Sequence, residues 1–406
     1  MTNMTQNQHL ELSTFGTAIS PSLTMAITAK ANQLKQEGHA VIGMSAGEPD
    51  FDTPDHICKA GIAAINEGKT RYTAASGLPI LKQAICDRVF VDHKLKYSPD
   101  QVVVSCGAKH SIFALLSAFL NPGDEVIVPA PYWVSYPDQL KMLGAKPVIV
   151  SCDESTSYKL TPDALKAAVT SKTKLLILNS PSNPTGMVYS AAELKALGDI
   201  LLAHDLYVLS DEIYAKLVYG VKHVSMATLS EELKERTFLV DGVAKAYAMT
   251  GWRIGYSIVP PYLAKVMSGM QSHSTSNPAT PSQYAALEAF SGSQDCVEDM
   301  RKVFEKRRSL MVDGLNAIEG IDCLLPEGAF YAFPNVSACF GKRSVKGIEI
   351  TDSLTFCSAF LDEQLVAAVP GVGFGADANI RMSYAASETD IIQALERLKS
   401  FVLSLV

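Results

Sequence analysis

From residue 101 onward, short apolar runs alternate with stretches of helical periodicity, and this alternation constrains the fold more than any other feature. Residues 101–105, QVVVS, favour a strand, and residues 108–119 have the apolar spacing of a helix. The same order recurs at 125–128 and 134–143. Further apolar runs lie at 147–150, 174–178, 207–209 and 238–240, with helical segments at 162–169 and 191–204. Strands that alternate with helices form βαβ units, so we expect an α/β domain whose mainly parallel sheet is covered by helices.

The pattern changes past about residue 285. A long, charged amphipathic helix is expected over 294–318, followed by short strands and helices in mixed order. We expect strands at 321–325, 330–333, 366–370 and 379–384, and helices at 353–363 and 388–405. This mixture predicts a second, smaller α+β domain.

A chain of 406 residues exceeds the usual size of one domain, and its 48% hydrophobic content is enough for a large core. The first 18 residues are polar and aperiodic, which is typical of an arm that orders only against another surface. We therefore expect an N-terminal arm at 1–18, a small domain formed by 19–54 with 294–406, and a large domain at 55–293.

Charge and cysteine usage exclude several functions. The formal charge is 35 − 42 = −7 without a basic run, which disfavours nucleic acid and anionic membranes as partners. The chain has no run of 18 apolar residues, and its start has neither the basic nor the apolar region of a secretory signal. Eight cysteines are scattered without metal-ligand spacing. We therefore expect reduced thiols, a cytoplasmic location and no metal site.

The stretch DGVAKAYAMTGWRIGY, residues 241–256, contains the first candidate for chemistry. Lys245 lies between alanines just past the apolar run 237–240, where an open α/β sheet has its ligand crevice. A lysine in an apolar turn has a lowered pKa and becomes a nucleophile that forms a Schiff base with a carbonyl. The alternative is a surface-loop lysine with small neighbours.

Two further motifs follow strand ends. Gly107, Ala108 and Lys109 carry a predicted strand into a helix, whose free N-terminal amides would hold a phosphate, although such turns are common. Trp133, in PYWVSYP, either belongs to the core or stacks on a flat ring.

Three polar side chains complete the candidate site. Asn183 lies in NSPSNPTG, a turn made rigid by its prolines, and Asp211 in SDEIY is either a helix cap or a buried acid that faces a cationic ring nitrogen. Arg381 lies in an apolar strand, where an arginine usually binds a carboxylate. GVGFG, residues 371–375, follows a proline and opens no helix, so we interpret it as a flexible turn rather than a phosphate loop.

In combination and in this order, AGEPDFDTP, PYWVSYP, NSPSNPTG, SDEIY and AKAYAMTGWRIGY resemble motifs of the class I pyridoxal-phosphate-dependent aminotransferases of fold type I. The resemblance covers nearly the whole chain. It is strongest to the aspartate aminotransferase subgroup of bacteria and plastids, which includes members that use prephenate.

The resemblance implies roles for residues of this chain toward pyridoxal 5′-phosphate. Lys245 would form the Schiff base and move the proton, Asp211 would pair with the ring nitrogen, and Trp133 would stack on the ring. Asn183 and Tyr214 would hydrogen-bond the ring oxygen. The phosphate would be bound by Arg253, by the turn at Gly107, Ala108 and Lys109, and by Tyr72 from the neighbouring subunit, so that a homodimer with shared active sites is the catalytic unit. Many relatives have hydroxyl residues beside the lysine where this chain has Ala244 and Ala246.

The resemblance also implies amino acid and 2-oxo acid substrates. Arg381 would bind the α-carboxylate with Asn183 and the amide of Gly47, and Trp133 would line the same site. Lys109 resembles the lysine that binds the distal carboxylate of acidic substrates. A solvated lysine is the alternative, although a lysine in a first helical turn is unfavourable against the helix dipole. We expect a ping-pong reaction through pyridoxamine phosphate, aspartate + 2-oxoglutarate = oxaloacetate + glutamate.

Other functions stay open at this point. Prephenate, aromatic amino acids or alanine could be the substrate, and a β-lyase or decarboxylase could use the same scaffold. A catalytically silent regulatory protein is disfavoured because Lys245 and Asp211 are both present. A nicotinamide dehydrogenase is disfavoured because no GxGxxG follows an early strand.

Overall fold

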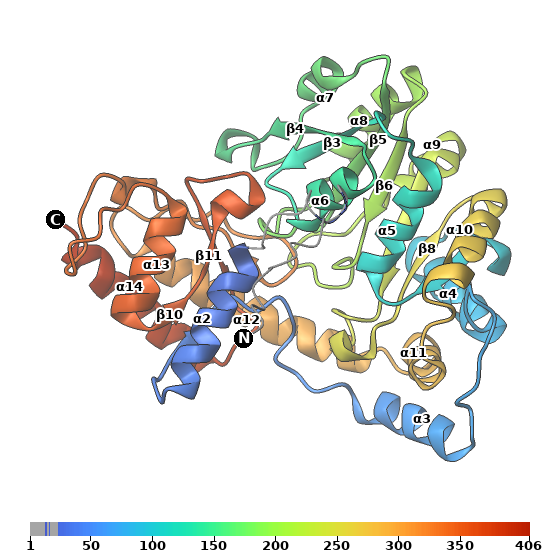
Figure 1. Cartoon of the computed structure of the whole chain (residues 1–406), viewed down its shortest axis with the longest axis horizontal. Coiled ribbons are helices and arrows are strands. Elements are labelled where there is room, and N and C mark those ends of the chain that lie inside the picture. The colour runs from blue at the N-terminus through green and yellow to red at the C-terminus, as the bar shows by residue number, and fades with distance from the viewer. Residues whose placement is uncertain (1–12, 14–15, 17–22) are drawn as a thin grey trace, which may run out of the picture.

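The computed structural model describes residues 13, 16 and 23–406, so the expected arm at 1–18 lies, except for Ser13 and Gly16, outside the described residues. Figure 1 shows one group of elements around a large sheet and a second group that contains the C-terminal helices, with α12 (Asp295–Asn316) running between them. No helix in the described part of the chain is long and apolar enough to cross a membrane.

The large sheet has seven strands in the order β2, β8, β7, β6, β5, β3, β4. Strand β8 is antiparallel to both of its neighbours, and all the other pairs are parallel. The strands are β2 Val102–Ser105, β3 Glu125–Ala130, β4 Lys146–Ser151, β5 Thr173–Asn179, β6 Tyr207–Asp211, β7 Thr237–Gly242 and β8 Gly255–Ile258. The predicted mainly parallel α/β sheet is thereby confirmed. Strand β8 was not expected, and its first two residues belong to the stretch 241–256 that contains Lys245.

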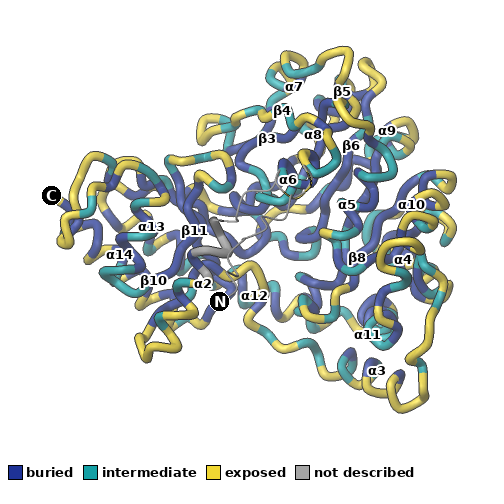
Figure 2. Tube along the Cα trace, viewed as in Figure 1, coloured by how far each residue is buried: buried dark blue, intermediate teal, exposed yellow. Residues whose placement is uncertain are grey.

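Helices cover both faces of this sheet because side chains alternate along each strand. Leu209 of β6 pairs with Phe238 of β7, and both point to the face covered by α5, α6 and α10. Their neighbours Val208 and Leu239 point to the opposite face. The covering helices are α5 Ala108–Phe119, α6 Ser135–Met142 and α10 Pro261–Ser274 on the first face, and α3 Asp55–Asn66, α4 Pro79–His93, α7 Pro162–Ala168, α8 Ala191–Ala203, α9 Glu231–Arg236 and α11 Thr280–Ser291 on the second. Figure 2 shows most of these strands as buried, whereas the edge strand β4 is partly exposed.

The C-terminal lobe, defined here as the elements around two small sheets, has its own apolar core. Strands β1 and β10 pair in parallel, and β12 pairs with β11 and β9 in antiparallel orientation. The elements are α2 Leu23–Gln36, α13 Ser353–Gln364, α14 Glu388–Ser404, β1 Ile42–Gly43, β9 Tyr331–Ala332, β10 Val366–Ala367, β11 Val369–Pro370 and β12 Ile380–Ser383.

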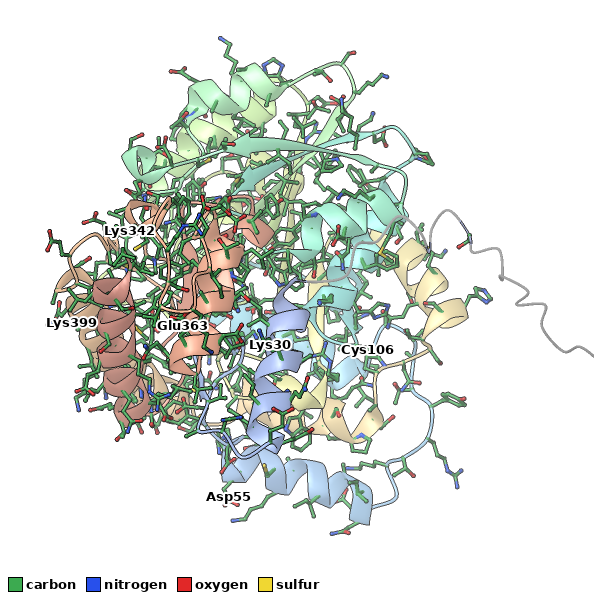
Figure 3. The ribbon with its side chains drawn as sticks, turned by 60° about the vertical axis from the view of Figure 1, so that its left-hand side comes forward. Lys30, Asp55, Cys106, Lys342, Glu363 and Lys399 are labelled. Carbon is green, nitrogen blue, oxygen red and sulfur yellow. The ribbon has the colours of Figure 1, made fainter. Side chains whose placement is uncertain are left out.

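Helix α2 is attached to this lobe although it comes from the other end of the chain. Its Lys30 forms an ion pair of 2.6 Å with Asp362 of α13, and Figure 3 shows Lys30 beside Glu363. In the same view, Cys106 lies among the elements of the large sheet, apart from Lys342 and Lys399 of the C-terminal lobe. The domain boundaries near residues 54 and 293 stay a prediction.

The sequence interpretation was wrong in three places of the C-terminal lobe. Residues 321–325 form no strand beyond an isolated bridge at Asp322, because Asn316 binds both backbone groups of Cys323 with its side-chain amide. The run 366–370 is divided between the two sheets at Ala368. The glycine-rich segment at 371–375 is no flexible turn, since residues 371–374 form a short 3-10 helix.

Candidate active site

Three parallel strands of the large sheet, β5, β6 and β7, end at one edge, and the candidates Asn183, Asp211 and Lys245 lie at or just after these ends. Asp211 is the last residue of β6 and pairs with Asn179 of β5 and Val240 of β7. Lys245 follows β7 in the turn at residues 244–247. Since the carboxyl ends of parallel strands are where open α/β sheets bind ligands, the fold brings these side chains to one crevice.

The amino group of Lys245 lies inside this crevice. Its Nζ donates a hydrogen bond of 2.5 Å to the carbonyl oxygen of Gly47, and it lies 5.9 Å from the ring centre of Tyr214. Burial, and next to it the positive charge of Arg381, lower the pKa of Lys245 to about 8. A substantial fraction of this amine is therefore neutral near pH 8 and able to attack a carbonyl. The alternative of a surface-loop lysine does not fit this burial.

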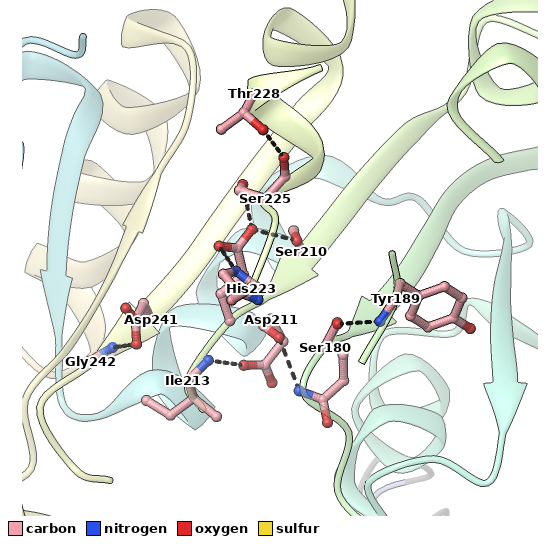
Figure 4. A network of polar contacts seen from close by, with 12 residues as sticks. Ser180, Tyr189, Ser210, Asp211, Ile213, His223, Ser225, Thr228, Asp241 and Gly242 are labelled. Atoms are coloured by element: carbon pink, nitrogen blue, oxygen red, sulfur yellow. Dashed lines mark hydrogen bonds and ion pairs between the residues drawn. The ribbon is translucent and has the colours of Figure 1, made fainter. Parts of the chain in front are cut away.

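Asp211 is a buried acid held from two sides. Its Oδ2 accepts a hydrogen bond of 2.6 Å from the hydroxyl of Tyr136, and Oδ1 accepts one of 3.3 Å from the amide of Ile213, the contact drawn in Figure 4. Burial raises the pKa of Asp211 to about 6, although the hydrogen bond from Tyr136 lowers it. Such a carboxyl is suited to pairing with a cationic nitrogen that enters the crevice.

Sequence reasoning did not select Tyr136. It lies in the first turn of α6, one helical turn after Trp133, and the two rings make an edge-to-face contact of 5.3 Å. The second tyrosine of PYWVSYP is therefore as much a part of the site as the tryptophan. Asn179 was also missed: its side chain donates to the carbonyl of Asp211 at 3.0 Å and accepts from the amide of Asn183 at 2.8 Å.

Arg381 reaches the crevice from β12 of the C-terminal lobe and is 4% exposed. Its guanidinium donates to Oδ1 of Asn183 and to the carbonyl of Ser45, both at 2.9 Å, and stacks 4.4 Å from the ring centre of Tyr331. Its Nε is buried without a hydrogen-bond partner, and no carboxylate in the described part of the chain forms an ion pair with it. A buried cation without a counter-ion is costly, so this geometry calls for an anionic ligand.

A tight turn at the start of α5 forms a second place for an anion. Gly107 has φ = 87°, and a Cβ there would lie 2.4 Å from Nη2 of Arg253. A Cβ on Gly255 would lie 2.2 Å from the amide nitrogen of Ala108. The first amides of α5, including that of Lys109, have no acceptor within the helix. The turn and the guanidinium together can hold a phosphate.

Arg253 is held toward this turn by an unusual backbone. Its φ is 56°, in the left-handed region that residues with a Cβ seldom occupy. Its guanidinium donates to the carbonyl oxygens of Thr250 at 2.9 Å and Cys106 at 3.3 Å. Strain of this kind is frequent where a side chain must be aimed at a ligand.

Lys109 and Tyr214 complete the pocket. Nζ of Lys109 lies 4.9 Å from the ring centre of Trp133, and the pKa of Lys109 is lowered by burial and by the charge of Arg253. The hydroxyls of Tyr214 and Tyr331 are 2.9 Å apart, which connects Tyr214 to the tyrosine that stacks on Arg381. Tyr331 is a further residue that the sequence analysis did not select.

Tyr72 is the candidate that the chain does not bring to its own crevice. Its side chain is 88% exposed and makes no hydrogen bond or ring contact with any residue that the structure describes. Gly47 is present, but its contact to Lys245 runs through the carbonyl oxygen rather than the amide.

Comparison with known proteins gives consistent results. A sequence model of the aminotransferases of class I and II matches residues 39–398. The chain is 51% identical over 386 residues to the aspartate aminotransferase of Geobacillus stearothermophilus, covering 95% of this chain and 97% of that protein. It is 48% identical to the aspartate/prephenate aminotransferase of Cereibacter sphaeroides, again covering 95% and 97%.

Solved structures agree over the same length. The aspartate aminotransferase of Rhizobium meliloti superposes with a TM-score of 0.95 at 44% identity and covers 98% of this chain and 100% of that one. The aspartate aminotransferase of Thermus thermophilus with maleate gives a TM-score of 0.90 at 39% identity, with coverages of 96% and 99%. The similarity therefore includes the large sheet and the C-terminal lobe alike.

Proposed function

Because this chain belongs to the aminotransferases of class I and II, we propose that it moves the amino group of aspartate to 2-oxoglutarate with pyridoxal 5′-phosphate as its cofactor. The observation that carries the proposal is the pairing of two unsatisfied groups in one crevice. Arg381 is a buried cation without a counter-ion, and Lys245 is a half-buried amine with a pKa of about 8. An α-amino acid supplies a carboxylate to the first while the second is available for chemistry at Cα.

The residues present fit this cofactor. The turn at Gly107 and the guanidinium of Arg253 match a phosphate, and Asp211 matches the protonated nitrogen of a pyridine ring. Trp133 offers an aromatic face beside the ring position, and Asn183 keeps its NH₂ group for the ring oxygen, since its Oδ1 accepts from Arg381. When bound, pyridoxal phosphate supplies a carbonyl for Lys245 and a ring that accepts electrons.

Each residue then has a defined task. Arg381 holds the α-carboxylate and so fixes the orientation of Cα–H. Nζ of Lys245 removes the proton from Cα of the substrate and delivers it to the carbon atom of the cofactor that carried the carbonyl group. A pKa of about 8 suits both proton transfers. Asp211 keeps the ring nitrogen protonated, and Tyr136 keeps Asp211 ionised. The amino group passes from the first substrate to the second in two half-reactions.

We further propose that Lys109 selects dicarboxylic substrates. Its ammonium group lies over Trp133, on the same side of the crevice, and has no acidic partner among the described residues. The similar Thermus thermophilus enzyme was solved with maleate, which is a four-carbon dicarboxylate. Aspartate therefore ranks first, and prephenate ranks second because a similar protein uses it.

We propose a homodimer in which the partner subunit's Tyr72 reaches the phosphate. Tyr72 extends into solvent, and Ile62 and Ile65 of α3 are each 57% exposed. An exposed apolar surface of this kind supports association with a second copy. All eight cysteines are free thiols, which supports a cytoplasmic location.

Steady-state assays with a panel of amino donors and 2-oxoglutarate test the function. We expect kcat/KM for aspartate to exceed that for alanine and phenylalanine by at least about tenfold, since one charge-assisted hydrogen bond contributes about 1.5–3 kcal/mol. A preference for phenylalanine as the amino donor, or for prephenate over 2-oxoglutarate as the amino acceptor, would keep the mechanism and replace the substrate. Release of ammonia without an oxo acid acceptor would identify a lyase instead.

A further inference from the structure

A second cluster of polar side chains lies on the other side of β6 from the proposed active site. Glu212 directly follows Asp211, and because successive side chains of an extended segment point to opposite faces, it points away from the crevice. There it meets His223 and also His93, the last residue of α4. One potential ligand atom from each of His93, Glu212 and His223 lies within 4.8 Å of the other two.

The carboxylate of Glu212 is buried and held firmly. The hydroxyls of Ser210 and Ser225 donate to Oε1 at 2.8 and 2.6 Å, and Oε2 lies 2.9 Å from Nε2 of His223. In Figure 4 dashed lines join this carboxylate to the labelled Ser210, Ser225 and His223. The cluster therefore contains a carboxylate that is fixed in place inside the protein.

Each imidazole has at least one ring nitrogen without a hydrogen-bond partner among the described residues. Nδ1 of His223 is buried without a hydrogen-bond partner, and the ring of His93 has none among the described residues. The two rings face each other edge to face with their centres 5.7 Å apart. Both line a cavity of about 360 Å³ that gives access to the cluster. A buried imidazole nitrogen without a partner, next to a buried carboxylate and the half-buried ring of His93, is an arrangement of donors that suits a cation.

We propose that His93, Glu212 and His223 form a binding site for a divalent transition-metal ion such as Zn²⁺. Two imidazoles and one carboxylate are a donor set that zinc accepts, with the fourth position open to the cavity. Zinc bonds of about 2.0–2.1 Å place neighbouring ligand atoms about 3.3 Å apart. Oε2 of Glu212 and Nε2 of His223 are 2.9 Å apart in a direct hydrogen bond, so a bound ion would replace this hydrogen bond, with a small separation of the pair and a rotation of His93.

Lys216 and Lys222 line the same cavity, and the ammonium group of Lys216 is paired with Asp92. A bound ion would connect the end of α4 to the segment after β6, directly behind Asp211, and would stabilise the fold there. The sequence predicted no metal site because the three ligands come from separate segments and show no ligand spacing. This proposal does not rest on the proposed function, since its tests do not measure turnover.

Calorimetric titration of the holoenzyme with zinc tests the site. Metal is first removed with a chelating resin, and the buffer contains no free cofactor or amino acid, because both chelate zinc. We expect one ion per chain with micromolar affinity or better. His93→Gln should weaken binding by about 100-fold or more, whereas the control His204→Gln, at an exposed histidine of the α8 cap, should bind like the wild type. Zinc should raise the Tm of the wild type and of the control but not that of His93→Gln.

Cobalt gives a readout that needs no variant. One equivalent of Co²⁺ bound by nitrogen and oxygen ligands in the wild-type holoenzyme should produce visible ligand-field bands that zinc abolishes. Absence of these bands, no saturable zinc binding, or equal zinc binding by His93→Gln and the wild type would each overturn the proposal. Should His93→Gln not fold, the cobalt spectrum of the wild type decides the matter.

Discussion

The hydroxyl of Tyr136 donates a hydrogen bond of 2.6 Å to Oδ2 of Asp211, and both side chains are buried. Two effects oppose each other in this pair. Burial raises the pKa of Asp211 to about 6, and the hydrogen bond from Tyr136 is the largest effect that lowers it. Tyr136 therefore determines how far Asp211 stays ionised near neutral pH, and with it the charge that the ring nitrogen meets.

Tyr136→Phe should move the acidic limb of the kcat/KM profile to higher pH. Loss of a hydrogen bond to a charged group costs about 1.5–3 kcal/mol, which corresponds to a rise of about 1–2 units in the pKa of Asp211. A pH profile between 5 and 9 measures the shift. Tyr189→Phe is the matched control, because Tyr189 is equally buried but its hydroxyl accepts from the amide of Leu160. Identical profiles for the two variants would contradict the role given to Tyr136.

Much of this site could be predicted from the sequence because strand ends in an α/β sheet converge. Lys245 and Asp211 follow apolar runs, so their place at one edge follows from the alternation of elements. Arg381 stands out as a charge in an apolar strand. Its lack of a counter-ion, however, depends on the approach of β12 to Asn183, which the local sequence does not reveal.

The residues that were missed give no local signal. Tyr136 lies one turn from Trp133 on α6 and has the pattern of an ordinary core aromatic. Tyr331 acts through contacts with Tyr214 and Arg381, which are distant in the sequence. The left-handed backbone of Arg253 is invisible in a string of residue types.

Asp211→Asn should stabilise the cofactor-free protein at alkaline pH while abolishing its activity. The folded pKa of Asp211, about 6, lies above the ordinary value of about 3.9. Its contribution to stability is therefore fully present below pH 3.9 and lost as the pH rises through 6. At pH 8 the neutral asparagine avoids a cost of up to about 3 kcal/mol in the free energy of unfolding.

Urea unfolding of the apoprotein at pH 8 and pH 5 measures the difference in stability between the variant and the wild type, which should shrink at pH 5. A variant less stable than the wild type at pH 8 would contradict this, and Asp199→Asn on the surface is the control.

Lys109→Ala should impair dicarboxylic substrates selectively. Removal of one charged contact should raise KM for aspartate by about 10- to 100-fold and leave KM for alanine within a few-fold. Initial rates with both donors at saturating 2-oxoglutarate measure the effect. Equal losses for aspartate and alanine would mean that Lys109 serves the phosphate turn and not the distal carboxylate.

Tyr72→Ala and Lys245→Ala should complement each other in a mixed dimer. Each variant alone lacks one group in every active site, but a mixed dimer has one site with Lys245 and the partner subunit's Tyr72 both intact. After the two proteins are unfolded and refolded together, activity at limiting cofactor should rise above that of either parent. Persistent inactivity, with subunit exchange shown by tagged chains, would contradict shared active sites.

The central claim is most directly tested by the absorbance spectrum of the purified holoenzyme during titration with amino acids. We expect a cofactor band that aspartate converts at lower concentration than alanine or phenylalanine does, and that 2-oxoglutarate restores. Lys245→Ala should lack this band and lose at least about 10⁴-fold in turnover. A wild-type protein that shows no band after addition of pyridoxal phosphate, or a Lys245→Ala variant that keeps full activity, would contradict the cofactor assignment and every role derived from it.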